Sequence, residues 1–228
     1  MPAKVIVALD FNEISQAQNF LTQVEPNLCK VKIGKAMFTR FGPEWVKQIV
    51  GLGFDVFLDL KFHDIPNTVE QACHAAADLG VWMVNVHALG GLKMLQAAKA
   101  GVSRASHQPK LIAVTILTSL QAQDCMAIGL PTNVQANVER LALLSQQAGL
   151  DGVVCSAQEA RSLRAKLGPE FLLVTPGIRL ETNKTDDQQR IMTPETAMQQ
   201  GASYLVIGRP ITQAADPKSV LQAINASF

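Results

Sequence analysis

Eight short apolar runs, interleaved with amphipathic stretches, constrain the fold of this chain more than any other feature. The runs cover residues 4–10, 29–34, 55–61, 82–87, 110–117, 151–156, 171–177 and 203–209. Most of them are apolar on both faces, which is typical of parallel strands that are covered on both sides. We therefore expect eight parallel β-strands, each followed by a helix.

The segments between these runs have the periodicity of helices. Residues 15–24, 68–80 and 133–149 carry apolar side chains at three- and four-residue spacing, as one buried helix face requires. Glycine closes several of the expected helices before the next strand, at Gly53, Gly80, Gly149 and Gly201.

The number and length of these units favour a closed (β/α)8 barrel. The 228 residues, shared among eight units, leave about 28 residues per unit, close to a minimal βα repeat. We expect one domain over residues 1–228. A doubly wound open sheet is the alternative, but no GxGxxG motif follows the first strand. Two long loops, residues 118–132 and 176–193, are expected to be functional.

Composition excludes several classes of protein. The net charge of +1 argues against a broad nucleic-acid-binding surface. The four cysteines are far apart and the histidines lack HxH or HExxH spacing, so neither a disulfide framework nor a zinc site is predicted. No apolar run has the length of a signal-peptide core or a membrane span. We expect a cytoplasmic protein with reduced thiols.

The third run ends in a cluster of charges. Asp59 and Lys61 share one face of the expected strand and Asp64 follows, whereas Val56 and Leu58 point to the other face. An isolated Asp-x-Lys pair is more often a salt bridge at a strand end. In a (β/α)8 barrel, however, chemistry is located at the carboxyl ends of the strands.

Other charged residues should join this cluster. The first strand ends at Asp10 and the second at Lys32, with Lys30 deeper on the same face. The lysines would oppose a divalent metal ion, which prefers several oxygen ligands. A protonated lysine can instead donate a proton to a carbanion, and a fixed carboxylate can repel a charged substrate group. Loss of CO2 from a substrate carboxylate would relieve that repulsion.

A second cluster is expected after strands seven and eight. Gly177 and Arg179 follow the seventh strand, and Gly208 and Arg209 follow the eighth. These loops form the usual phosphate site of such barrels, because glycine admits backbone N–H groups and arginine grips phosphate. His87, at the end of the fourth strand, is expected to be a hydrogen-bonded structural residue.

Several motifs occur in the order of a known enzyme family. They are KIG at 32–34, DLKFHDIPNT at 59–68, LTS at 117–119, TPGIR at 175–179, DQQR at 187–190 and MTP at 192–194. Over essentially its whole length the chain resembles the orotidine 5′-phosphate decarboxylases. The resemblance implies conversion of the nucleotide orotidine 5′-monophosphate to UMP and CO2 in pyrimidine biosynthesis, without a metal or organic cofactor.

The resemblance also implies residue roles. Lys61 would protonate a C6 carbanion, Asp59 would lie beside the substrate carboxylate, and Lys32 would bridge Asp59 and the ribose. The other implied substrate-binding residues are Asp10, Ile65, Thr68, Thr118, Arg179, Gln188, Gly208 and Arg209. A homodimer is implied, in which Asp64, Ile65 and Thr68 reach the neighbouring active site.

Three alternatives fit the same barrel less well. A 3-keto-L-gulonate 6-phosphate decarboxylase uses magnesium and an acidic ligand where this chain has Lys32. A ribulose-phosphate 3-epimerase would need several histidine ligands at strand ends, where only His87 stands. A non-catalytic sugar-phosphate binder would have no need of the carboxylates.

Overall fold

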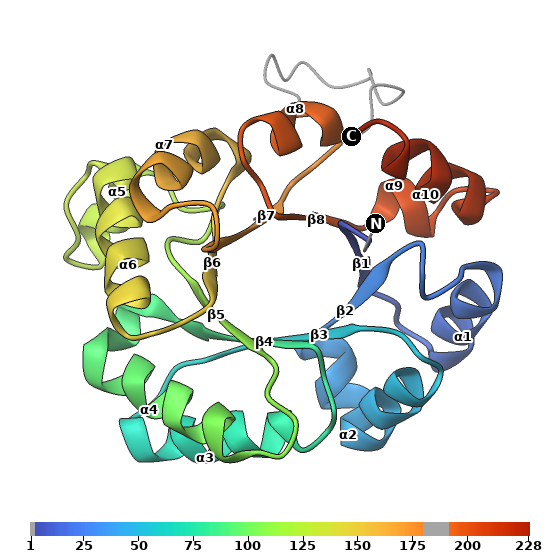
Figure 1. Ribbon diagram of the computed structural model, residues 1–228, viewed down its shortest axis with the longest axis horizontal. Coiled ribbons are helices and arrows are strands. Elements are labelled where there is room, and N and C mark those ends of the chain that lie inside the picture. Colours follow the sequence, from blue (N-terminus) through green and yellow to red (C-terminus); the bar gives the residue numbers. More distant parts are fainter. Residues whose placement is uncertain (1–2, 180–191) are drawn as a thin grey trace.

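The strands of the computed structural model, which describes residues 3–179 and 192–228, close into a barrel (Figure 1). They are β1 (Val5–Leu9), β2 (Lys30–Gly34), β3 (Val56–Phe62), β4 (Met83–His87), β5 (Lys110–Val114), β6 (Gly152–Val154), β7 (Leu172–Pro176) and β8 (Tyr204–Ile207). Each strand is parallel to its neighbours, and β8 pairs with β1. The predicted (β/α)8 barrel is confirmed, and the open-sheet alternative is excluded by this closure.

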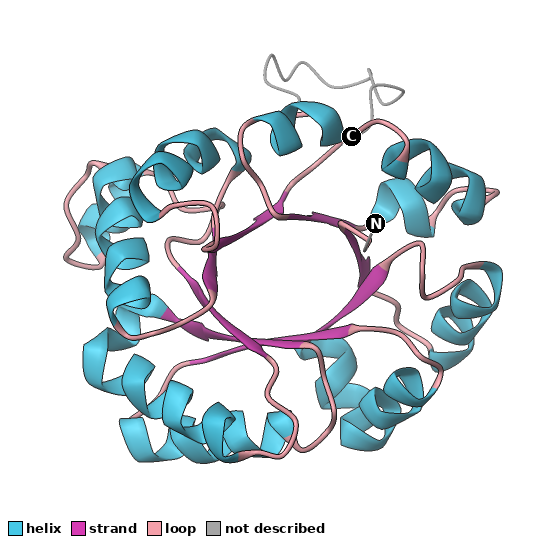
Figure 2. Cartoon of the chain, viewed as in Figure 1, coloured by secondary structure: helices cyan, strands magenta, loops and turns pink. Residues whose placement is uncertain are grey.

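Helices surround the ring of strands (Figure 2). They are α1 (Ile14–Gln23), α2 (Lys35–Gly51), α3 (Pro66–Ala77), α4 (Gly91–Arg104), α5 (Ala122–Ala127), α6 (Val134–Gln147), α7 (Ala157–Leu167), α8 (Pro194–Gln199), α9 (Arg209–Thr212) and α10 (Pro217–Asn225), with a 3-10 turn at Ala88–Gly90. Within the described residues, no helix is long and apolar enough to cross a membrane.

Two apolar layers hold the barrel. Ile6, Phe57 and Met83 belong to a cluster that fills the barrel interior. Val56 and Leu58 belong to a larger cluster that joins strands to the surrounding helices. The predicted alternation along β3 is therefore confirmed. Because of this alternation, Asp59 and Lys61, which follow Phe57 on the same face of β3, lie at the carboxyl-terminal mouth of the barrel.

Local signals set most element boundaries. The four glycines predicted to close helices all have φ between +78° and +100°, which residues with a β-carbon rarely adopt. β5 ends at Val114, three residues earlier than predicted, because its partner β6 ends at Val154. The loop at 118–132 contains α5, whose first turn is closed by a hydrogen bond from Gln121 N to Asp124 Oδ2 (2.8 Å).

Candidate active site

Four charged side chains meet at the carboxyl ends of β1, β2 and β3. Lys61 Nζ lies 2.6 Å from Asp59 Oδ1, and Lys32 Nζ lies 3.4 Å from Asp59 Oδ2. Lys32 Nζ is also 3.7 Å from Asp10 Oδ1. Asp59 is only 8% exposed. The structure thus brings together the residues predicted at these strand ends, as a chain of alternating charge.

The environment of Asp59 keeps its carboxyl ionised. Burial raises its pKa, but the ammonium groups of Lys32 and Lys61 lower it, and so do hydrogen bonds from Lys61 and Asn85. The net effect is a pKa below the usual value. A buried carboxylate with two cationic neighbours can hold its negative charge while a substrate approaches.

The backbone of β3 is irregular where this array forms. The regular β3–β4 pairing stops at Leu58 and resumes at Phe62. Among the described residues other than glycine, Lys61 alone has a positive φ, of 53°. Such a conformation is costly for a residue with a β-carbon and is often found at functional sites. This irregularity is a bulge in β3 between Leu58 and Phe62. It lies where the Lys61 side chain contacts Asp59, two residues earlier in the chain.

Asn85 of β4 completes the site and was missed in the sequence. Its side chain is fully buried; Nδ2 donates to Asp59 Oδ1 (2.6 Å) and Oδ1 accepts from Lys61 N (2.8 Å). The available signal was a single amide residue within the apolar run of β4. Gly34 is a second missed residue, because a β-carbon there would lie 3.3 Å from Lys32 Nζ.

His87 differs from its prediction. It lies at the end of β4, and its Nδ1 is buried without a hydrogen-bond partner among the described residues. Its ring is 5.6 Å from that of His63. Burial, followed by the charges of His63, Lys35 and Lys61, lowers its pKa to about 4 against a smaller opposing effect of Asp59. The expectation of a hydrogen-bonded structural histidine is therefore wrong at this nitrogen.

Other predicted residues lie around the mouth of the barrel and face solvent. Asp64 and Ile65 are exposed on the turn from β3 into α3, Thr68 is exposed in the first turn of α3, and Ile65 is 66% exposed. Asp64 Oδ1 accepts a hydrogen bond from Ile65 N (2.6 Å). Thr118 is exposed on the loop that follows β5.

The predicted phosphate-binding residues follow β7 and β8. Gly177 has a φ of +80°, and Arg179 N donates to Met192 O (3.3 Å), which holds the two described ends of this loop together. Gly208 precedes α9, whose first residue, Arg209, is exposed. Gln188, also predicted here, lies outside the described residues.

A known family matches the chain over almost its whole length. Residues 3–224 match the model of the family described as orotidine 5′-phosphate decarboxylase / HUMPS. The chain belongs to this family. The resemblance inferred from the sequence motifs is thereby confirmed.

Curated relatives in the family are similar over almost the whole chain. Orotidine 5′-phosphate decarboxylase from Hydrogenovibrio crunogenus is 58% identical over 99% of this chain and 95% of its own length. The protein of that name from Tolumonas auensis is 59% identical over 99% of this chain and 98% of its own. The crystal structure of the Lactobacillus acidophilus decarboxylase superposes with a TM-score of 0.87, at 40% identity and 99% coverage of each chain.

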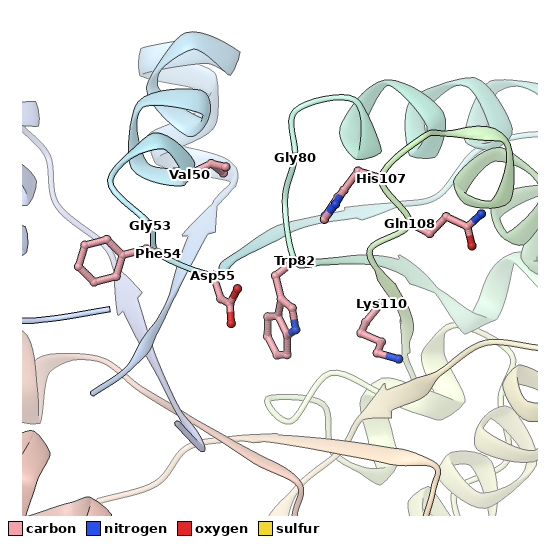
Figure 3. A pocket seen from close by; sticks show the side chains of 9 residues that line it. All are labelled: Val50, Gly53, Phe54, Asp55, Gly80, Trp82, His107, Gln108 and Lys110. Carbon is pink, nitrogen blue, oxygen red and sulfur yellow. The ribbon is translucent and has the colours of Figure 1, made fainter. Parts of the chain in front are cut away.

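A cavity of about 250 Å³ lies at the opposite, amino-terminal mouth of the barrel (Figure 3). Its lining includes Asp55, Trp82 and Lys110, which precede or begin β3, β4 and β5. Asp55 pairs with the buried Lys30, whose ammonium is 4.3 Å from the Trp82 ring centre. The carboxylates and lysines of the family motif do not line this cavity.

Within residues 3–179 and 192–228, no three metal-binding side chains are grouped to hold an ion.

Proposed function

We propose that this protein decarboxylates orotidine 5′-monophosphate to UMP and CO2, as the last step of UMP synthesis. The observation that carries the proposal is the buried contact between Asp59 and two lysines, Lys32 and Lys61, at the carboxyl-terminal mouth of a family barrel. Membership of the family and the names of its relatives support the choice of substrate.

Asp59 is proposed to destabilise the bound substrate. The substrate carboxylate would lie against the ionised Asp59 side chain when the ring is seated beside Lys61. Two such charges about 4 Å apart, at an effective dielectric constant near 20, interact by roughly 4 kcal/mol. Departure of CO2 removes the substrate charge, so the repulsion is relieved along the reaction and lowers the barrier.

Lys61 is proposed to stabilise and then protonate the product carbanion. The bond between C6 and the carboxylate carbon breaks, and its electron pair remains on C6. The Lys61 ammonium transfers one proton from Nζ to C6, which gives UMP and a neutral amine that regains its proton from water. Its ion pair with Asp59 (2.6 Å) holds the ammonium in place before the reaction.

The remaining site residues are proposed to bind the nucleotide. Asp10 and Lys32 would contact the ribose hydroxyls, and Thr118 the pyrimidine edge. The phosphate would be held by the residues after β7 and β8, namely Arg179, Gln188, Gly208 and Arg209. Because the phosphate is remote from the breaking bond, its binding energy can offset the cost of pressing the carboxylate toward Asp59.

A homodimer is part of the proposal. Asp64, Ile65 and Thr68 are exposed together beside the charged array, and Ile65 is a large apolar side chain facing solvent. We propose that a second copy covers this segment and that Asp64 then completes the neighbouring site. Burial of Ile65 in that contact would remove apolar area from water.

The direct test mixes the purified protein with orotidine 5′-monophosphate and a chelator, and follows the orotate ultraviolet absorbance. We expect rapid loss of absorbance with UMP as the product, unaffected by the chelator. Activity that requires added magnesium would instead favour the metal-dependent relatives. Absence of turnover under both conditions, with UMP still bound, would contradict the catalytic role of Lys61 and leave only a nucleotide-binding site.

A further inference from the structure

Asn85 occupies a place that backbone pairing would normally fill. Between the pairs at Leu58 and Phe62, β3 carries three residues and β4 carries one, Asn85. The N–H of Lys61 therefore donates to the Asn85 side chain at 2.8 Å rather than to a β4 carbonyl of a regular ladder. A partly buried N–H without this acceptor would be costly, so the Asn85 amide stabilises the irregular backbone of Lys61.

The same side chain also holds the carboxylate. Asn85 Nδ2 donates to Asp59 Oδ1 at 2.6 Å, and that oxygen is also the one that contacts Lys61 Nζ. One amide thus fixes the Asp59 side chain and the backbone of Lys61 at once. Only a side chain with a donor and an acceptor on one planar group serves both partners, because the N–H needs an acceptor and the carboxylate needs a donor.

We propose that Asn85 is a positioning residue for decarboxylation, acting through Asp59 and Lys61 rather than by touching the substrate. It keeps the Asp59 carboxylate and the left-handed backbone of Lys61 in the mutual orientation that the reaction uses. This inference rests on the proposed function. It adds a residue of β4 to a site otherwise built from β1, β2 and β3 and the loops.

The first test replaces Asn85 with alanine. We expect kcat to fall by about tenfold to a hundredfold, the range for loss of hydrogen bonds to charged or buried groups. Affinity for UMP should stay within about twofold, because the phosphate site lies after β7 and β8. The Lys61 amide should exchange its hydrogen faster, since its acceptor is gone.

The second test is Asn85→Asp, which keeps the acceptor for Lys61 N but replaces the donor to Asp59. The charged groups of the surrounding strands are Lys32 of β2 and Asp59 and Lys61 of β3. His87 of β4 is titratable, but its pKa of about 4 leaves it neutral over the pH range of the test. At low pH the two carboxylates share one proton, which resides on residue 85 because the lysines stabilise the charge of Asp59. The protonated acid then donates to Asp59 as the amide does.

The pH profile of this variant separates positioning from mere structural support. We expect the ratio of its kcat to that of the wild type to rise by about tenfold as the pH falls from about 8.5 to about 5.5. Asn137→Ala is the matched control, since Asn137, on the outer helix α6, is also buried and donates a hydrogen bond to Pro131 O (2.6 Å). It should lower stability without changing kcat.

The outcomes are distinct. The proposal would be overturned if the ratio of the Asn85→Asp kcat to the wild-type kcat did not change with pH. It would also be overturned if Asn85→Ala lost UMP affinity in proportion to kcat. Either result would leave Asn85 a structural role only. If Asn85→Ala does not fold, the recovery of kcat in Asn85→Asp as the pH is lowered tests the proposal by itself. Absence of turnover in the wild type would contradict the proposed function instead, and the exchange rate of the Lys61 amide would still test the positioning.

Discussion

Lys61 combines a left-handed backbone with an ion pair to a buried carboxylate. Replacing it with alanine removes the proposed proton donor but leaves the phosphate-binding loops intact. We expect kcat to fall by about a thousandfold or more, the scale of general acid and electrostatic contributions combined. UMP affinity, measured by calorimetry, should remain within about threefold of the wild type. Lys47→Ala, on the exposed face of α2, is the control, and near-normal turnover of Lys61→Ala would contradict the mechanism.

His87 should make stability depend on pH. In the unfolded chain its pKa is near 6.5, whereas burial and then the neighbouring positive charges lower it to about 4 in the folded protein. Between these values the unfolded state binds more protons, so stability falls as the pH is lowered. The contribution of His87 to the free energy of unfolding therefore has an upper limit of about 3 kcal/mol. We expect a smaller value, because the ring is only partly buried and solvent screens its charge.

Replacement of His87 with glutamine should remove this contribution. Urea unfolding at about pH 4.5 and about pH 7 should show a smaller pH difference in the variant than in the wild type. Equal differences in the two proteins would show that the histidine does not titrate abnormally in the folded chain.

At the level of elements, Arg164 ties α7 to the strands that follow it. Its guanidinium donates to the carbonyl oxygens of Gly168 (2.6 Å), Phe171 (2.7 Å) and Gly201 (2.8 Å). Lysine keeps the charge but cannot reach three carbonyls, so Arg164→Lys should lower the free energy of unfolding by about 2 kcal/mol. Urea titration measures the loss. Arg161→Lys, at an exposed position on the same helix, should change stability little, and equal effects of the two would contradict this role.

The loops after β7 and β8 are proposed to form a second functional element. Arg209→Ala should weaken UMP binding by about tenfold to a hundredfold, because a charge-assisted contact to the phosphate is lost. Calorimetric titration with UMP measures the change. Lys218→Ala is the control, since it removes an equal charge from α10, where Lys218 pairs with Glu25 at 2.5 Å. Unchanged affinity in Arg209→Ala would place the phosphate elsewhere.

At the level of the whole molecule, the proposed dimer predicts complementation. Lys61→Ala and Asp64→Ala chains should each be nearly inactive alone. A heterodimer of the two contains one site with both residues intact if Asp64 acts across the interface. After unfolding and refolding together, the mixture should recover about a quarter of wild-type activity, because about half of the dimers are mixed. Recovery of no activity would place Asp64 in the site of its own chain.

The sequence alone determined the architecture and most of the charged array. Eight apolar runs of strand length, separated by helical periodicity, fit few folds other than a closed barrel of parallel strands. Once that fold is set, residues at the ends of β1, β2 and β3 must converge, as Asp10, Lys32, Asp59 and Lys61 do. The motif around Lys61 is contiguous in the chain, so it indicates the family without any knowledge of how distant segments pair.

Only the tertiary structure revealed the contacts of Asn85, the bulge of β3 and the His87 Nδ1, which has no hydrogen-bond partner within the part of the chain that the structure describes. Asn85 is a single polar residue in an apolar run, and its partners lie 24 and 26 residues earlier, on the neighbouring strand. The register of β3 against β4 decides whether that amide meets a backbone N–H and a carboxylate. Local periodicity specifies which face a side chain takes, but the pairing of distant segments determines what it meets there.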